Sequence, residues 1–128
     1  MILVDTSVWI DHLRGGNPEL ARLLDQSLVL THPFVVGELA CGNLKHRTRI
    51  LADLDALPRA VTATHDEVLR LIADRKLWGS GLGWIDAHLL ASALLTGCGF
   101  WTLDRKLERA ARAKELTTKA QSHKVPYS

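Results

Sequence analysis

The sequence predicts an α/β fold with a parallel sheet, and three observations lead to that class. The chain has 128 residues, the length of one ordinary domain. Apolar residues make up 47% and charged residues 23% of it, which excludes collagen, coiled coil and disorder. Short apolar runs alternate with helical patterns, as in sheets whose parallel strands need crossover connections. We therefore expect a single domain over residues 1–128, with helices on both faces of the sheet.

The first elements of the chain follow from local signals. Residues 2–4 (ILV) are short and apolar, as expected of a strand, and residues 7–14 form a predicted helix that ends at two glycines. Asn17 followed by Pro18 is typical of a helix start, because Asn caps the helix and Pro fits its first turn. Leucines then recur at helical spacing, and residues 28–30 form the second predicted strand.

Two helices and a strand are predicted in the middle of the chain. Pro33 favours the start of a helix that carries the segment FVVGELACG. A further helix, which Pro58 ends, has apolar side chains at helical spacing, namely Ile50, Leu51, Leu54 and Leu57. Residues 60–62 are the third predicted strand.

The last third of the chain repeats the alternation. Residues 64–67 (Thr-x-x-Glu) have the form of a capping box at a helix start. Residues 79–83 (GSGLG) form a flexible loop, and residues 84–95 form a helix that is apolar on nearly every face and therefore buried. Residues 100–103 are the fourth predicted strand, and residues 104–115 the last helix.

Charge is unevenly distributed. The formal net charge is +2, but residues 105–128 carry seven Lys or Arg and two Glu, a net of +5, which leaves −3 on residues 1–104. An acidic body beside a basic end can bind cations and attract a polyanion, although a solvated helix face explains the same pattern.

Cysteine usage and hydropathy indicate a reduced, cytoplasmic protein without a membrane segment. Cys41 and Cys98 lie in apolar stretches, where we expect buried thiols, and neither has the spacing of a zinc site. The N-terminus lacks the basic region of a signal peptide. The longest stretch without charged residues, residues 87–103, is interrupted by Gly97 and Gly99 and makes a poor membrane span.

Four acidic residues stand in apolar surroundings, each after a strand or at a helix start: Asp5, Glu38, Asp86 and Asp104. Ligands of parallel sheets bind at the carboxyl ends of the strands, the edge at which these acids gather. Taken singly, Asp5 and Asp104 could be helix caps, and Asp86 could complement a helix dipole. A Glu in an otherwise apolar helix, as Glu38 is, needs a partner.

Taken together, the four acids predict a metal site. At an effective dielectric constant of about 20 and a separation of about 5 Å, each like-charge pair costs about 3 kcal/mol. Some of the acids must therefore carry protons, or a divalent cation must bind. Carboxylate oxygens favour Mg²⁺ or Mn²⁺, whereas zinc would prefer His or Cys. Carboxylate-held Mg²⁺ mostly serves phosphoryl chemistry. The sequence has no G-x-x-x-x-G-K-S/T nucleotide loop, so phosphodiester hydrolysis is favoured.

Four segments together resemble a known family. VDTSVWIDHL, GELACG, WIDAHLLASALL and FWTLDRKL resemble the PIN domain and, more narrowly, the VapC toxins of prokaryotic toxin–antitoxin pairs. The resemblance covers residues 1–116. It implies a three-layer α/β/α fold with a four-stranded parallel sheet of order 3-2-1-4 and usually a fifth strand. Here a fifth strand could come only from residues 124–127, within a basic tail over residues 117–128.

The resemblance also implies an activity and a set of site residues. It implies a Mg²⁺- or Mn²⁺-dependent endoribonuclease that cuts tRNA, rRNA or mRNA by metal-activated water and leaves 5′-phosphate and 3′-hydroxyl ends. Asp5 and Asp86 correspond to the core metal ligands, and Glu38 and Asp104 to ligands that bind directly or through water. The hydroxyls of Ser7 and Thr102 would orient the acids or their waters.

The partners implied are a second copy of the chain and a cognate VapB-type antitoxin that neutralises it. The apolar helices around residues 34–57 are the expected docking surface for that antitoxin. Trp78 and Trp84 flank the glycine loop and are expected to meet RNA or a partner subunit, whereas Trp9 and Trp101 are expected in the core.

Two alternatives remain open at this point. One is a PIN-like module that binds RNA or protein without cutting, against which the intact acids argue. The other is a phosphoacceptor receiver-like domain, which would need paired acids at the first strand and a Lys after the last; the sequence shows neither.

Overall fold

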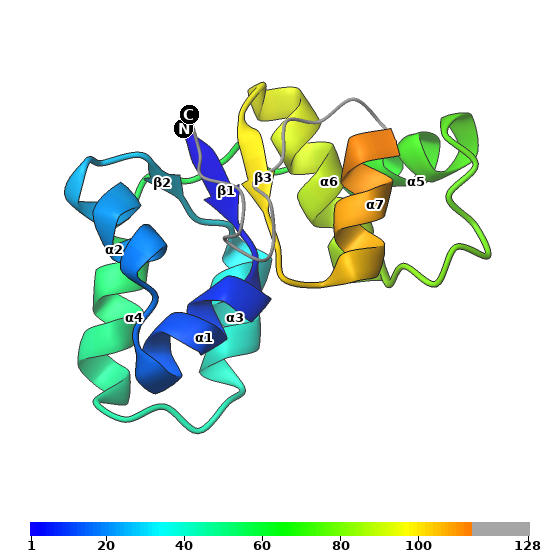
Figure 1. The fold of residues 1–128 in the computed structure, drawn as a ribbon. Coiled ribbons are helices and arrows are strands. Elements are labelled where there is room, and N and C mark those ends of the chain that lie inside the picture. Colours follow the sequence, from blue (N-terminus) through cyan, green and yellow to red (C-terminus); the bar gives the residue numbers. More distant parts are fainter. Residues whose placement is uncertain (114–128) are drawn as a thin grey trace.

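Three parallel strands lie at the centre of the computed structural model, which describes residues 1–113 (Figure 1). They are β1 (Ile2–Val4), β2 (Val29–Leu30) and β3 (Gly99–Trp101), in the order β2-β1-β3. Ile2 lies opposite Val29 on one side and Gly99 on the other. The α/β class and the position of the first strand between the second and the last are as the sequence predicts.

Helices flank the sheet on two sides (Figure 1). On the side of β2 lie α1 (Thr6–Gly15), α2 (Pro18–Asp25), α3 (Pro33–Ala40) and α4 (Arg47–Asp55). On the other side lie α5 (His65–Asp74), α6 (Trp84–Thr96) and α7 (Arg105–Ala113). No helix among residues 1–113 is long and apolar enough to cross a membrane.

The predicted helix starts agree with the capping contacts. The Asn17 side chain accepts a hydrogen bond from the Leu20 N–H, with Pro18 in the first turn of α2. Thr64 and Glu67 exchange both hydrogen bonds of a capping box at the start of α5. These signals are local in sequence, so the sequence alone is sufficient to place them.

The predicted third strand does not form. Residues 60–62 are not a strand, and the segment makes only an isolated parallel bridge between Thr31 and Arg59 beside β2. The next donors turn to α6 instead of a neighbouring strand, because the Val61 N–H bonds to the Thr96 hydroxyl and the Ala63 N–H to the Ser92 hydroxyl. The described sheet therefore has three strands rather than four. The possible fifth strand, at residues 124–127, lies outside the described residues.

The core surrounds β1 and β3, and one expectation about burial is wrong. Trp9 and Trp101 are buried, as expected. Cys41, however, is exposed, because α3 ends one residue earlier and the chain turns away from the core there. Cys98 is partly buried beside β3.

A buried histidine joins α3 to α6. His32 precedes α3, and its Nδ1 accepts the Phe34 N–H at 3.0 Å while its Nε2 lies 3.1 Å from the Ser92 hydroxyl oxygen. Burial, with smaller contributions from the charges of His88 and Arg59, lowers the pKa of His32 from 6.5 to about 4. The folded protein therefore keeps this ring neutral over a range in which the unfolded chain protonates it.

This difference predicts a pH dependence of stability. Because the folded-state pKa of His32 is lowered, its contribution is fully present above about pH 6.5 and is lost as the pH falls towards about 4. The loss amounts to about 3 kcal/mol at about 1.4 kcal/mol per pKa unit. Urea unfolding between these pH values should show the free energy of unfolding of the wild type falling relative to that of His32→Asn, since Asn can still accept the Phe34 N–H. Parallel pH profiles for the two proteins would contradict this account.

Candidate metal-binding site

Asp5 ends β1 and is the most buried of the four acids. Its backbone N–H donates to the Trp101 carbonyl at 2.9 Å, which joins the ends of β1 and β3. Its side-chain Oδ2 accepts hydrogen bonds from the hydroxyls of Ser7 at 2.8 Å and Thr102 at 2.7 Å. Although Asp5 occupies the N-cap position of α1, its side chain caps no backbone N–H. The carboxylate is thus held by side chains rather than used as a cap.

The two hydroxyls are themselves fixed by the chain that follows β3. The Ser7 oxygen accepts the Leu103 N–H at 2.9 Å, and the Thr102 oxygen accepts the Asp104 N–H at 3.0 Å. Each hydroxyl therefore directs its hydrogen to Asp5. The predicted fourth strand, residues 100–103, stops at Trp101 because these bonds draw the chain out of the sheet.

Asp86 and Asp104 each cap a helix with one oxygen. Asp86 Oδ2 accepts the Gly83 N–H at 3.1 Å at the start of α6. Asp104 Oδ1 accepts the N–H groups of Lys106 at 2.9 Å and Leu107 at 3.2 Å at the start of α7. The structural role considered for each from sequence is therefore real. It occupies only one of the two carboxylate oxygens.

Glu38 lies on the exposed face of α3 and finds its partner in α1. The Thr6 hydroxyl donates to Glu38 Oε1 at 2.7 Å. Sequence reasoning missed Thr6, although it stands between Asp5 and Ser7 and shares the first turn of α1 with them. A hydroxyl directly after the strand-ending acid is the signal that indicated it.

Each of the four carboxylates has one oxygen with a protein donor and one without, among residues 1–113. The oxygens without a donor are Asp5 Oδ1, Glu38 Oε2, Asp86 Oδ1 and Asp104 Oδ2. Carboxylate oxygens of this kind are the donors that Mg²⁺ and Mn²⁺ prefer. In chemical type, the residues fit a hard divalent cation.

Electrostatics connect the four acids. The pKa of Asp86 is raised above its ordinary value, chiefly by burial and also by the negative charges of Asp5, Asp104 and Glu38, while the Gly83 hydrogen bond opposes the change. The four side chains thus share one field, although no three His, Cys, Asp or Glu side chains among residues 1–113 are arranged as a finished metal-ligand set. Like charges repel one another, so bringing the acids together requires a positive charge between them.

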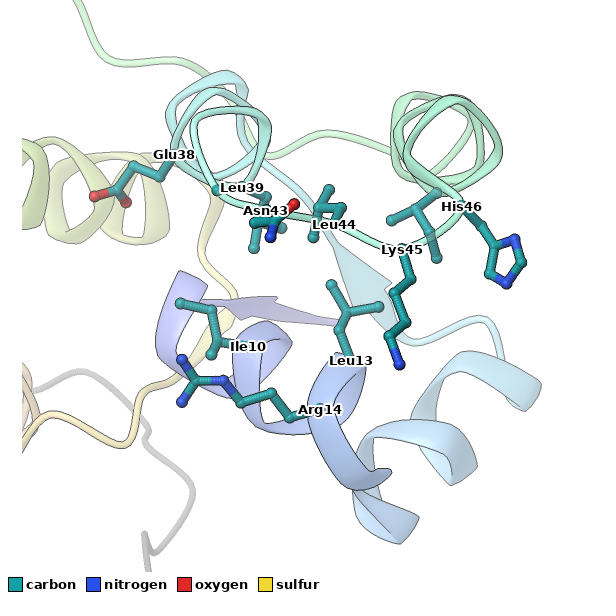
Figure 2. Close-up of a pocket in the computed structure, with 11 residues that line it drawn as sticks. Ile10, Leu13, Arg14, Glu38, Leu39, Asn43, Leu44, Lys45 and His46 are labelled. Carbon is teal, nitrogen blue, oxygen red and sulfur yellow. The ribbon is translucent and has the colours of Figure 1, made fainter.

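A groove of about 580 Å³ runs from Glu38 along α1 and α3 (Figure 2). Its apolar lining comes from Ile10, Leu13, Leu39, Leu44 and Ile50. Arg14 and Glu38 extend towards one end of the groove, and Lys45 and His46 lie towards the other, before α4 (Figure 2). The groove therefore combines an apolar floor with basic side chains and ends at one of the four acids.

Comparison with known proteins identifies related sequences. The sequence model of the PIN domain matches residues 2–113. Two curated relatives from two strains of Mycobacterium tuberculosis, both named Ribonuclease VapC32, are 50% identical to the chain over 111 residues, which is 86% of this chain and 90% of theirs.

Solved structures show the same fold at low sequence identity. FitAcB from Neisseria gonorrhoeae is 19% identical, with a TM-score of 0.66 over 96% of this chain and 99% of that one. FitAB bound to the IR36 DNA fragment is 17% identical, with a TM-score of 0.69 over 100% of both chains. PAE2754 from Pyrobaculum aerophilum is 18% identical, with a TM-score of 0.61 over 91% of this chain and 82% of that one.

The Asp5 contacts predict that the Thr102 hydroxyl stabilises the fold. Thr102→Val keeps the shape of the side chain but leaves a buried carboxylate oxygen and the Asp104 N–H short of one partner each. We expect a loss of about 1–3 kcal/mol in the free energy of unfolding, measured by urea denaturation.

Thr31→Val is the matched control. The Thr31 hydroxyl is buried and has no hydrogen-bond partner among residues 1–113, so its removal should leave stability unchanged or slightly increased. Equal losses in the two variants would show that the Asp5 contacts contribute nothing specific.

Proposed function

Because this chain belongs to the PIN-domain family, and within it to the VapC toxins, we propose that it is a Mg²⁺- or Mn²⁺-dependent endoribonuclease. It would hydrolyse phosphodiester bonds of tRNA, rRNA or mRNA and leave 5′-phosphate and 3′-hydroxyl ends. The observation that carries the proposal is the set of four carboxylates that share one field, each with an oxygen free of protein donors among residues 1–113. The family predicted from the four sequence motifs is confirmed, and the relatives' name, ribonuclease, supports the activity.

The metal would be held by the oxygens that the chain does not use. Asp5 and Asp86 would be the core ligands, and Glu38 and Asp104 would bind directly or through water. When bound, the cation lowers the pKa of water and neutralises charge on the phosphate. Since protons compete with the cation for Asp86, whose pKa is raised, metal binding should strengthen as the pH rises.

The other residues of the site prepare these ligands. Ser7 and Thr102 hold one Asp5 oxygen and so fix the direction of the second. Thr6 does the same for Glu38, and the helix starts at Gly83 and Lys106 do so for Asp86 and Asp104. A carboxylate already held in position loses less conformational freedom when it binds a metal.

A VapB-type antitoxin would occupy the groove between α1 and α3. Its apolar floor suits a helix or an extended segment, and the groove ends at Glu38, so an occupant would block the approach of RNA to that acid. We further propose that the toxin is a homodimer and acts in the cytoplasm.

The alternative is a PIN-like module that binds RNA or protein without cutting. The specific observation in its favour is that no three acids among residues 1–113 form a finished ligand set. Both functions predict RNA binding, and only the proposed one predicts metal-dependent cleavage.

Cleavage of purified total RNA by the full chain, freed of any antitoxin, separates the two. We expect discrete fragments with 5′-phosphate ends in Mg²⁺ or Mn²⁺ and none in EDTA. Asp86→Asn should lower the rate about 100-fold or more, because loss of a metal ligand costs several kcal/mol. Asp25→Asn, an exposed acid at the end of α2, is the control and should cleave normally. RNA binding without cleavage in any metal would support the silent module.

The antitoxin proposal predicts separate effects on neutralisation and on cleavage. Ile10 is 37% exposed and lines the groove, so Ile10→Asp should abolish rescue of growth by the co-expressed antitoxin gene while RNA cleavage persists. Val61 is 54% exposed and lies outside the groove, so Val61→Asp should still be rescued. Rescue of both variants would exclude this groove as the docking surface.

A further inference from the structure

A chain of ring contacts extends outward from the core at the start of α6. The rings of Phe34 and His88 are 4.6 Å apart, those of His88 and Trp84 are 4.8 Å apart, and those of Trp84 and His65 are 5.0 Å apart. The inner rings are shielded, while the Trp84 side chain is 39% exposed. An aromatic surface is thus presented to solvent on a buried aromatic base.

The Trp84 ring is oriented before any ligand arrives. His88 meets it nearly edge-on, with 83° between the ring planes, and His65 from the adjacent α5 lies against it at 52°. His88 is only 5% exposed, and its Nδ1 has no hydrogen-bond partner among residues 1–113. These neighbours restrict the rotation of the indole, which reduces the entropy lost when a ligand stacks on it.

Trp84 lies beside the candidate metal site. It is the first residue of α6, two residues before Asp86, and the Gly83 N–H before it is bonded to the Asp86 carboxylate. A group stacked on Trp84 would therefore sit next to the phosphodiester that Asp86 addresses.

A lysine crosses the loop that precedes Trp84. Lys106 follows Asp104 at the start of α7, and its side chain lies so close to Gly81 that a Cβ there would be 3.5 Å from Nζ. Gly81 also has a φ of +86°, which other residues rarely adopt. The loop thus accommodates a cation that can attract the phosphate backbone.

We propose that Trp84 and His65 form a stacking platform for an unpaired base of the RNA, next to the bond that is cut, with Lys106 holding an adjacent phosphate. This inference rests on the proposed function and adds to it the substrate class, a nucleotide outside a double helix. Bases that are splayed out of a helix are recognised in this way, by aromatic side chains that stack on them.

The surroundings favour a base over a second copy of the chain. Stable interfaces between subunits have an apolar centre. Around Trp84 the exposed neighbours are His65, Gly83 and Lys106. Val61 and Leu95, which are exposed and aliphatic, lie at the other end of α6. An isolated aromatic ring among basic and polar groups suits a nucleotide.

Fluorescence of short single-stranded RNAs that carry 2-aminopurine, mixed with the full chain in EDTA at low salt, tests the platform without cleavage. The wild type should bind and quench the fluorescent base, and Trp84→Ala should bind about 10-fold more weakly and lose the quenching. Trp84→Phe should restore both. Trp78→Ala is the matched control, because Trp78 is 64% exposed near the other end of the same loop and should be dispensable.

The outcomes distinguish this inference from the proposed function. Binding by Trp84→Ala equal to the wild type, or no binding of single-stranded RNA by the wild type, would overturn the platform whether or not RNA is cut. Dissociation of a dimer by Trp84→Ala with unchanged quenching would assign the surface to a second copy instead. Quenching that depends on Trp84, in a protein that never cleaves RNA with Mg²⁺, would support the platform and reject the nuclease.

Discussion

The hydrogen bonds to Asp5 connect parts of the chain that are almost a hundred residues apart in sequence. Its N–H reaches the Trp101 carbonyl, and one carboxylate oxygen accepts the hydroxyls of Ser7 and Thr102. The same hydroxyls hold the backbone that leads into α7. The end of the first strand and the start of the last helix are therefore set by a single carboxylate. Asp104 owes its position to this arrangement, so the geometry of the candidate site and the stability of the sheet depend on the same few bonds.

Four acids on one edge of a sheet are a burden on folding unless something offsets their repulsion. Here each one has a donor from the chain itself, a hydroxyl or a backbone N–H at a helix start. These bonds stabilise the charged form, yet they leave Asp86 with a raised pKa because burial and the other three charges outweigh one hydrogen bond. The chain thus supports the acids individually and leaves their mutual repulsion to be relieved by a cation.

The sequence was sufficient to predict features that depend on neighbours along the chain. Asn17 and the Thr64–Glu67 pair mark helix starts through contacts three residues long, and the acid after an apolar run marks the end of β1. The strand expected at residues 60–62 failed for a reason that local sequence does not contain. Its donors were taken by the hydroxyls of Ser92 and Thr96, about 30 residues further on. The pairing of Thr6 with Glu38 across 32 residues was hidden for the same reason.

The segment that replaces the missing strand also affects how the protein can associate. An open sheet edge invites pairing with a strand from another chain. Beside β2 the segment begins at Pro58, which has no N–H to offer, and continues with N–H groups of Val61 and Ala63 that are already bonded to α6. Growth of the sheet past this edge is therefore blocked by backbone chemistry. Any protein that binds on this side has to recognise side chains on helices, where specificity resides in shape and charge rather than in a backbone ladder common to all sequences.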